Sequence, residues 1–157
     1  MENLKKMFEA VELQLVIIVV LGIINIAISH TIYSDVVTLD QLLAASTSPL
    51  AMVSLVFGLL SLVVTAWAGY VWVKESKGTA VDGGKAGALV SAISGIITGA
   101  LSAIYITPIM DRLYSAAGVP GMAGTGLAAV SFVIGIVVAA VIGFILGLIG
   151  GAFGKGK

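Results

Sequence analysis

Long apolar runs alternate with short polar segments along this chain. Four runs reach the ~20 residues that a helix needs to cross a hydrocarbon core about 30 Å thick: Leu13–Tyr33, Pro49–Val73, Lys85–Ile106 and Gly126–Gly150. The pattern predicts four transmembrane helices. With their short connections these runs use almost all of residues 1–157, so we expect one all-α membrane domain without a separate soluble domain.

Residues 1–12, before the first run, have the spacing of an amphipathic helix. Apolar side chains that share one stripe are Leu4, Phe8, Val11 and Leu15. Glu2 and Lys6 are four residues apart, in the order that favours a helix-stabilising ion pair. We therefore expect a cytoplasmic helix on the membrane surface that leads into the first transmembrane helix. The first run is longer than the core of a signal peptide, which predicts that it is retained.

The connections carry helix-start signals. Thr38 precedes a short leucine-containing stretch, and Ser48-Pro49 has the composition of a capped helix start. Residues 107–117 can form one or two further turns before the break at Gly118-Val119-Pro120-Gly121. Residues 74–84 are polar and contain glycine, so we expect a solvated turn there.

Charge is distributed asymmetrically between the two sides of the predicted bundle. Hydrophobic residues make up 59% of the chain and charged residues only 10%. Lysines precede the first run, lie between the second and third, and end the chain, whereas Arg112 falls on the opposite side. The positive-inside rule then places both termini in the cytoplasm, and we expect the plasma membrane. Aromatic residues at the ends of the runs support this topology.

Small residues recur at every fourth position in the third and fourth runs. The third run contains Gly87, Ser91, Gly95, Gly99 and Ala103, and the fourth contains Gly135, Ala139, Gly143, Gly147 and Gly151. At this spacing the small residues form one narrow stripe on each helix, along which backbones can approach closely. We expect these two helices to pair through their stripes as a glycine zipper.

A few polar residues lie inside the apolar runs. Asn25 should face another helix, because an unpaired amide in hydrocarbon costs on the order of a kcal/mol or more. Ser94, Thr98 and Ser102 form a second stripe in the third run. Two interpretations stay open for these residues: hydroxyls bonded to carbonyls of their own helix, or a polar lining that includes Asn25.

The sequence gives little support for catalysis or for metal binding. It contains one histidine, His30, no cysteine, and no acidic pair within a run. Asp35 and Asp40 lie near His30 in sequence but follow no metal-ligand spacing, so we expect a solvated rim. Glu12 lies at the mouth of the first run, where a surface charge is expected. We predict no catalytic residue, cofactor, metal site or nucleic-acid partner.

These observations favour a non-catalytic membrane protein that serves as a structural or accessory subunit. Its partners would be the lipid bilayer and either copies of itself or other membrane subunits. A small pore or carrier formed by an oligomer is the first alternative, because hydroxyl-lined routes can pass water or small solutes. A membrane protein of a virion or envelope is the second alternative.

Overall fold

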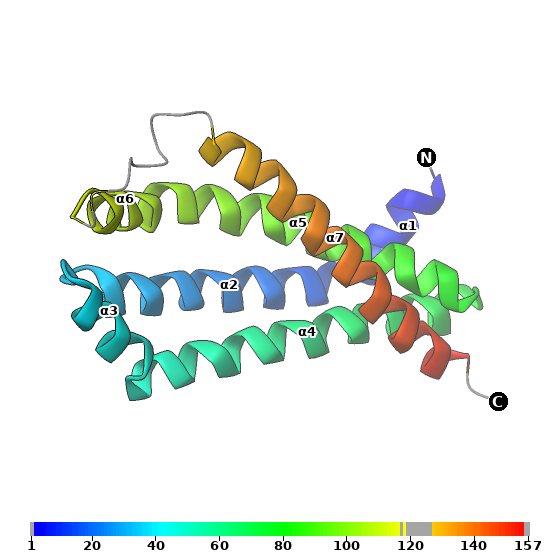
Figure 1. The fold of residues 1–157 in the computed structure, drawn as a ribbon. Helices are drawn as coiled ribbons and strands as arrows, with labels where there is room; N and C mark the ends of the chain where they lie inside the picture. Colours follow the sequence, from blue (N-terminus) through cyan, green and yellow to red (C-terminus); the bar gives the residue numbers. More distant parts are fainter. Residues whose placement is uncertain (1, 117, 119–126, 156–157) are drawn as a thin grey trace.

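The computed structural model describes residues 2–116, 118 and 127–155, and within these residues all regular structure is α-helical (Figure 1). The four helices that are long and apolar enough to span a membrane are α2 (Glu12–Tyr33), α4 (Pro49–Ser76), α5 (Ala80–Tyr105) and α7 (Leu127–Gly154). The shorter helices are α1 (Glu2–Ala10), α3 (Leu39–Ser46) and α6 (Thr107–Ala116). The prediction of an all-helical chain with four long apolar helices is confirmed.

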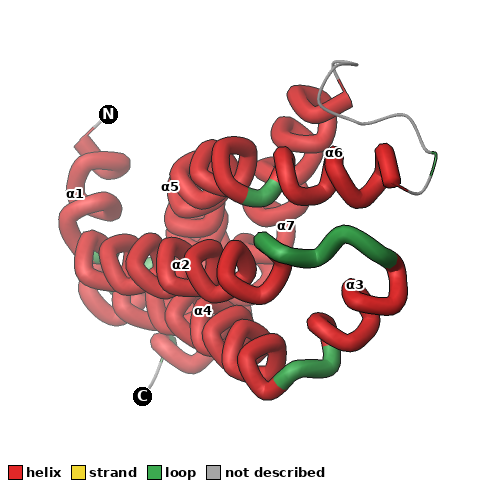
Figure 2. Tube along the Cα trace, turned by 90° about the vertical axis from the view of Figure 1, so that its left-hand side faces the viewer, coloured by secondary structure: helices red, strands yellow, loops and turns green. Residues whose placement is uncertain are grey.

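The central pair of helices is α4 and α5, which contact each other and also contact both α2 and α7. The most extensive helix pair is α5 with α7, and α7 crosses the bundle obliquely (Figure 1). Both chain ends lie with α1 and the α4–α5 turn at one end of the bundle, which we call the terminal end. Helices α3 and α6 lie at the opposite end, called the α3/α6 end (Figures 1 and 2).

Helix starts at the α3/α6 end follow the sequence signals. The Thr38 hydroxyl accepts a hydrogen bond from the Gln41 N–H at 3.3 Å, and α3 begins at the next residue. The Ser48 hydroxyl accepts from the Ala51 N–H at 3.2 Å, with Pro49 in the first helical turn of α4. Both predicted caps are confirmed.

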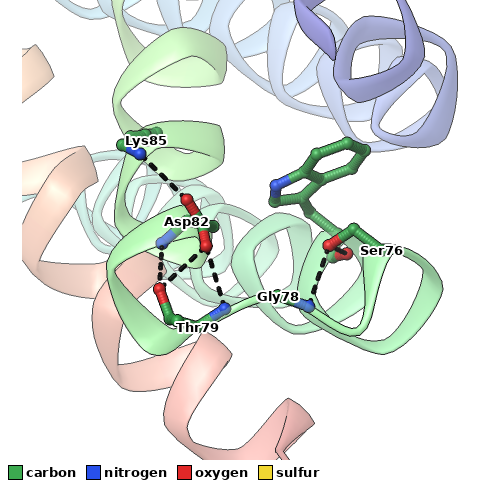
Figure 3. A network of polar contacts seen from close by, with 6 residues as sticks. Ser76, Gly78, Thr79, Asp82 and Lys85 are labelled. Carbon is green, nitrogen blue, oxygen red and sulfur yellow. Dashed lines mark hydrogen bonds and ion pairs between the residues drawn. The ribbon is translucent and has the colours of Figure 1, made fainter.

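The α4–α5 turn is shorter than expected (Figure 3). Most of residues 74–84, predicted as a solvated turn, is helical, because α4 continues to Ser76 and α5 begins at Ala80. Thr79 and Asp82 form a capping box that satisfies N–H groups at the start of α5. The Lys85 ammonium lies 2.9 Å from the Asp82 carboxylate. This Thr-x-x-Asp signal was present in the sequence and sets the helix start.

Helix α1 is separate from α2, with a break at Val11. The predicted ion pair is present, with Lys6 Nζ 2.8 Å from the Glu2 carboxylate. The buried side of the segment differs from the predicted stripe: Met7 and Val11 are buried, whereas Leu4 and Phe8 are exposed. The break at Val11 changes the direction of the chain, so a stripe continuous from Leu4 to α2 does not form.

The connection between α6 and α7 is only partly described. Helix α6 matches the predicted helical turns after Thr107, and Gly118 has a positive φ of 72°. Val119, Pro120, Gly121 and Gly126 lie outside the described residues. The last helix continues past the predicted end at Gly150 to Gly154.

The main cluster of buried apolar side chains lies in the terminal half of the bundle, while Val36 and Ile109 are buried separately at the α3/α6 end. The main cluster contains Met7, Val11, Leu15, Ile18, Ala68, Ala86 and Val90. Many large apolar side chains elsewhere on the long helices are exposed, including Leu59 of α4 and Val137 of α7. A surface of this kind is suited to hydrocarbon contact.

Candidate functional site

Three helices meet at a junction of glycines in the terminal half. A methyl group added at Gly147 of α7 would overlap the Gly83 carbonyl oxygen of α5 and lie 2.8 Å from the Gly87 Cα. A methyl group at Gly87 would overlap the Gly143 carbonyl oxygen, and one at Gly69 of α4 would overlap the backbone of Gly147. Backbones of α4, α5 and α7 therefore approach one another directly at Gly147, which is buried.

The junction extends along α4 through residues that the four-residue spacing did not identify. A methyl group at Gly150 would overlap the Ala66 carbonyl oxygen, and one at Gly154 would lie 2.7 Å from the Tyr70 carbonyl oxygen. Gly83 continues the third-run stripe by one step, so its spacing was a usable signal. On α4, Ser61, Thr65 and Gly69 are also spaced by four residues, a shorter repeat that we did not predict to be a packing face.

The two predicted stripes separate toward the α3/α6 end. Ser91 lies against Gly143, and Gly151 lies near Gly83, whereas the Cβ position of Gly95 is an ordinary 3.6 Å from Ala139. Around the Cβ position of Gly135, no described atom other than those of its chain neighbours and its own helix backbone lies within 4 Å. Gly99 faces a side chain instead of a backbone, because its Cβ position is 2.6 Å from the Phe132 ring. Close backbone contact is thus confined to the terminal half.

Where α7 leaves α5, a cavity of about 760 Å³ lies between α2, α5, α6 and α7. Its floor is α5 from Gly95 onward together with Ile106, which follows the helix, and its walls are the second half of α2 and residues 131–139 of α7. Helix α6 contributes the lining at the α3/α6 end. This cavity is the candidate site, and the glycine junction bounds it toward the terminal end.

Three of the four residues proposed as a polar lining, Asn25, Thr98 and Ser102, line this cavity. Ser94 is buried below it, and its hydroxyl donates to the Ser91 carbonyl at 3.2 Å. Thr98 likewise donates to the Ser94 carbonyl, at 2.8 Å. The hydroxyl protons of Ser94 and Thr98 are therefore used within α5.

Asn25 forms a bond between helices. Its side-chain oxygen accepts a hydrogen bond from the Ser54 hydroxyl of α4. One helical turn before Asn25, Gly22 makes room for the Thr98 methyl group, which a side chain at Gly22 would overlap. These two contacts hold α2 against α4 and α5 beside the cavity.

Aromatic and charged groups surround the α3/α6 end of the cavity. Tyr33, Asp111 and Tyr114 contribute to the lining there. Arg112 of α6 donates to the Ser34 carbonyl at 3.1 Å, which ties α6 to the end of α2. The His30 and Tyr105 rings pack edge to face with centroids 6.0 Å apart. No group of three or more potential metal-ligating side chains occurs among the described residues.

A second hollow, of about 610 Å³, lies at the terminal end between α1 and the α4–α5 turn. Its charged lining includes Lys6 and Lys85, each already paired with an acid of its own helix. Glu12 nearby is exposed, in keeping with the expected surface charge. Gln14 is only 3% exposed, and its side-chain oxygen has no hydrogen-bond partner among the described residues.

Sequence reasoning found the polar floor of the cavity and missed most of its walls. Gly22 and Ser131 carry no recognisable motif, and Phe132 resembles any lipid-facing aromatic residue. Only the relative tilt of α2, α5 and α7 brings these residues around one space. Comparison with known proteins yields no match, whether to a protein family, to a curated protein or to a solved structure.

Proposed function

We propose that this protein is a non-catalytic integral membrane protein that acts as a structural or accessory subunit of a membrane assembly. The observation that carries the proposal is the glycine junction, where backbones of α4, α5 and α7 are in direct contact. Contacts of this kind leave little freedom to rearrange and suit a rigid scaffold. The surrounding apolar surface is available to lipid or to other membrane subunits.

The proposal includes packing of α5 and α7 as a glycine zipper over the terminal half. It also places both chain ends in the cytoplasm, with the plasma membrane as the expected location. Support for this orientation comes from the lysines around the terminal end, including Lys6, Lys74 and Lys85. Basic residues are enriched on the cytoplasmic side of membrane proteins.

The accessory role is tested by gentle extraction from the native membrane through an affinity tag. We expect other membrane subunits, or further copies of this chain, to be recovered in fixed stoichiometry. A lone monomer after extraction in several mild detergents would contradict the role.

Orientation is tested separately, because the chain contains no cysteine. Lys77→Cys at the α4–α5 turn should react with an impermeant reagent only from the cytoplasm. Asp40→Cys in α3 should react only from outside. Labelling of both variants from one side would refute the topology and leave the accessory role untouched.

A small carrier or oligomeric pore is the second candidate, favoured by the gathering of Asn25, Thr98 and Ser102 around one cavity. If Thr98 lines a wetted route, Thr98→Val should reduce the flux of water or a small solute into reconstituted vesicles. For an accessory subunit, we expect flux equal to that of empty vesicles with either residue. The intrahelical bond of Thr98 and the glycine junction below the cavity support the second outcome.

A further inference from the structure

We infer that the cavity between α2, α5, α6 and α7 binds one acyl chain of a membrane lipid, drawn from the leaflet at the α3/α6 end. The inference requires insertion in a membrane but not the accessory role. It rests on the length of the cavity, on the chemistry of its walls and on its accessibility from the side of the bundle.

The length of the cavity matches one leaflet. Its floor runs along α5 from Gly95 and ends at Ile106, just after the helix, and this stretch rises about 17 Å at 1.5 Å per residue. A complete hydrocarbon core is about 30 Å thick, so the floor covers roughly half of it. A transmembrane helix of a partner needs a groove along the whole bundle, which the glycine junction closes. A single lipid chain needs only the half that is open.

The walls suit an apolar chain. Phe132, Ile136 and Ile26 contribute to the lining, and the cavity volume of about 760 Å³ is within the usual range for ligand sites. Two of its polar groups already have partners: the Thr98 hydroxyl donates within α5, and the Asn25 side-chain oxygen accepts from the Ser54 hydroxyl.

The polar end of the cavity is where a lipid headgroup would lie. Tyr33, Asp111 and Tyr114 line this end, and tyrosine is favoured at the headgroup level. Lateral entry is also available, because α2 and α7 form opposite walls and make no extensive contact with each other. A chain can therefore enter from the bilayer without passing through the bundle.

Two glycines provide a matched test. Gly135 lines the cavity, and Gly58 lies on α4 outside it. Apart from chain neighbours and their own helix backbone, neither has a described atom within 4 Å of its Cβ position. Gly135→Leu should fill part of the cavity without disturbing helix packing. Gly58→Leu adds the same side chain on a surface away from the cavity. Both variants should keep wild-type helicity and thermal stability in detergent.

The probe is phosphatidylcholine with unsaturated acyl chains. Wild type and both variants are reconstituted in vesicles of this lipid, extracted into mild detergent, and washed until bulk lipid is removed. Lipid retained per chain is then measured by native mass spectrometry. We expect one retained lipid in wild type and Gly58→Leu. Gly135→Leu should retain about tenfold less, since losing burial of only two methylene groups has an effect of this size.

Equal retention by all three proteins, or no retention by wild type, would overturn the inference. Should Gly135→Leu fail to fold, Ala103→Leu on the cavity floor carries the same expectation. A second copy as occupant is tested with Ser131→Cys on the α7 wall. Disulfide-linked dimers of Ser131→Cys in vesicles, with no lipid retained by wild type, would assign the cavity to protein contact and overturn the inference.

Discussion

Gly147 and Gly135 belong to the same four-residue repeat on α7 but have opposite surroundings. Gly147 is enclosed by backbone of α4 and α5, whereas Gly135 faces open space beside the cavity. The same residue type therefore permits contact in the terminal half and leaves volume unfilled in the α3/α6 half. A glycine stripe indicates where helices can approach, and helix tilt decides where they do.

The difference has a geometric cause. Two helices that cross at an angle stay in close contact only near the crossing point, and their separation grows along both axes. Close contact of α5 with α7 is centred on Gly87, Gly143 and Gly147. Beyond Gly95 the Phe132 ring occupies part of the space between α5 and α7, and the rest of that space is the cavity. The close packing in the terminal half and the cavity in the α3/α6 half therefore both result from the angle at which α5 and α7 cross.

The largest expected effect comes from the smallest possible side chain at the junction. Gly147→Ala places a methyl group against backbone atoms of Gly83 and Gly87, which cannot move aside as a side chain can. We expect a loss of roughly 3 kcal/mol in the free energy of unfolding, near the upper end for overpacking. The loss is measured by unfolding the detergent-solubilised wild type and variant with a denaturing detergent.

Gly58→Ala is the control, because its Cβ position has no described neighbour within 4 Å. Replacing glycine by alanine in an exposed helix interior gains up to about 1 kcal/mol. The two substitutions should therefore change stability in opposite directions. Similar values for both would show that the junction is looser than the structure has it, and would remove the basis of the comparison.

The sequence was sufficient for the helices and for several of their ends. Apolar run length predicted the four long helices, and Thr38 and Ser48 predicted two starts. The start of α5 was missed because the polar residues 74–84 outweighed the capping box at Thr79. Polar composition indicates contact with solvent but not the backbone conformation, because the solvent-exposed end of a helix can have the same composition as a turn.

The candidate site was predictable only in part. Four-residue spacing indicated which faces of α5 and α7 can approach, but it gave no information on Ala66 and Tyr70 of α4 or on where the contact ends. Asn25 and Thr98 stood out because polar residues are rare in apolar runs. The wall residues Gly22 and Phe132 did not, since a cavity depends on the relative position of several helices.

A smaller effect is expected at the boundary between the two halves of the bundle, where the Thr98 methyl group packs against Gly22. Gly22→Ala should cost about 1–2 kcal/mol, because its methyl group would overlap that of Thr98. Thr98→Ser removes the Thr98 methyl group and keeps the hydroxyl that bonds to Ser94. In the Thr98→Ser background, Gly22→Ala should therefore be close to neutral.

Unfolding of the two single variants and the double variant gives the coupling directly. A coupling of at least about 1 kcal/mol is expected for two groups that occupy the same space. Additive effects would mean that α2 and α5 are farther apart than the structure places them. The boundary of the close-packed half would then lie nearer the terminal end.

The smallest expected effect concerns the α3/α6 half, where a polar bond between helices takes the place of backbone contact. Ser54 donates to Asn25 across α4 and α2, whereas Ser61 of the same helix donates to its own Phe57 carbonyl at 3.0 Å. Ser54→Ala should cost about 0.6 kcal/mol, the average for such bonds in membranes. Ser61→Ala should cost less, because it removes no contact between helices.

In an Asn25→Ala background the cost of Ser54→Ala should disappear, while that of Ser61→Ala should persist. If Ser54→Ala costs the same with and without Asn25, the bond does not hold α2 to α4, and the α3/α6 half depends on apolar contacts alone.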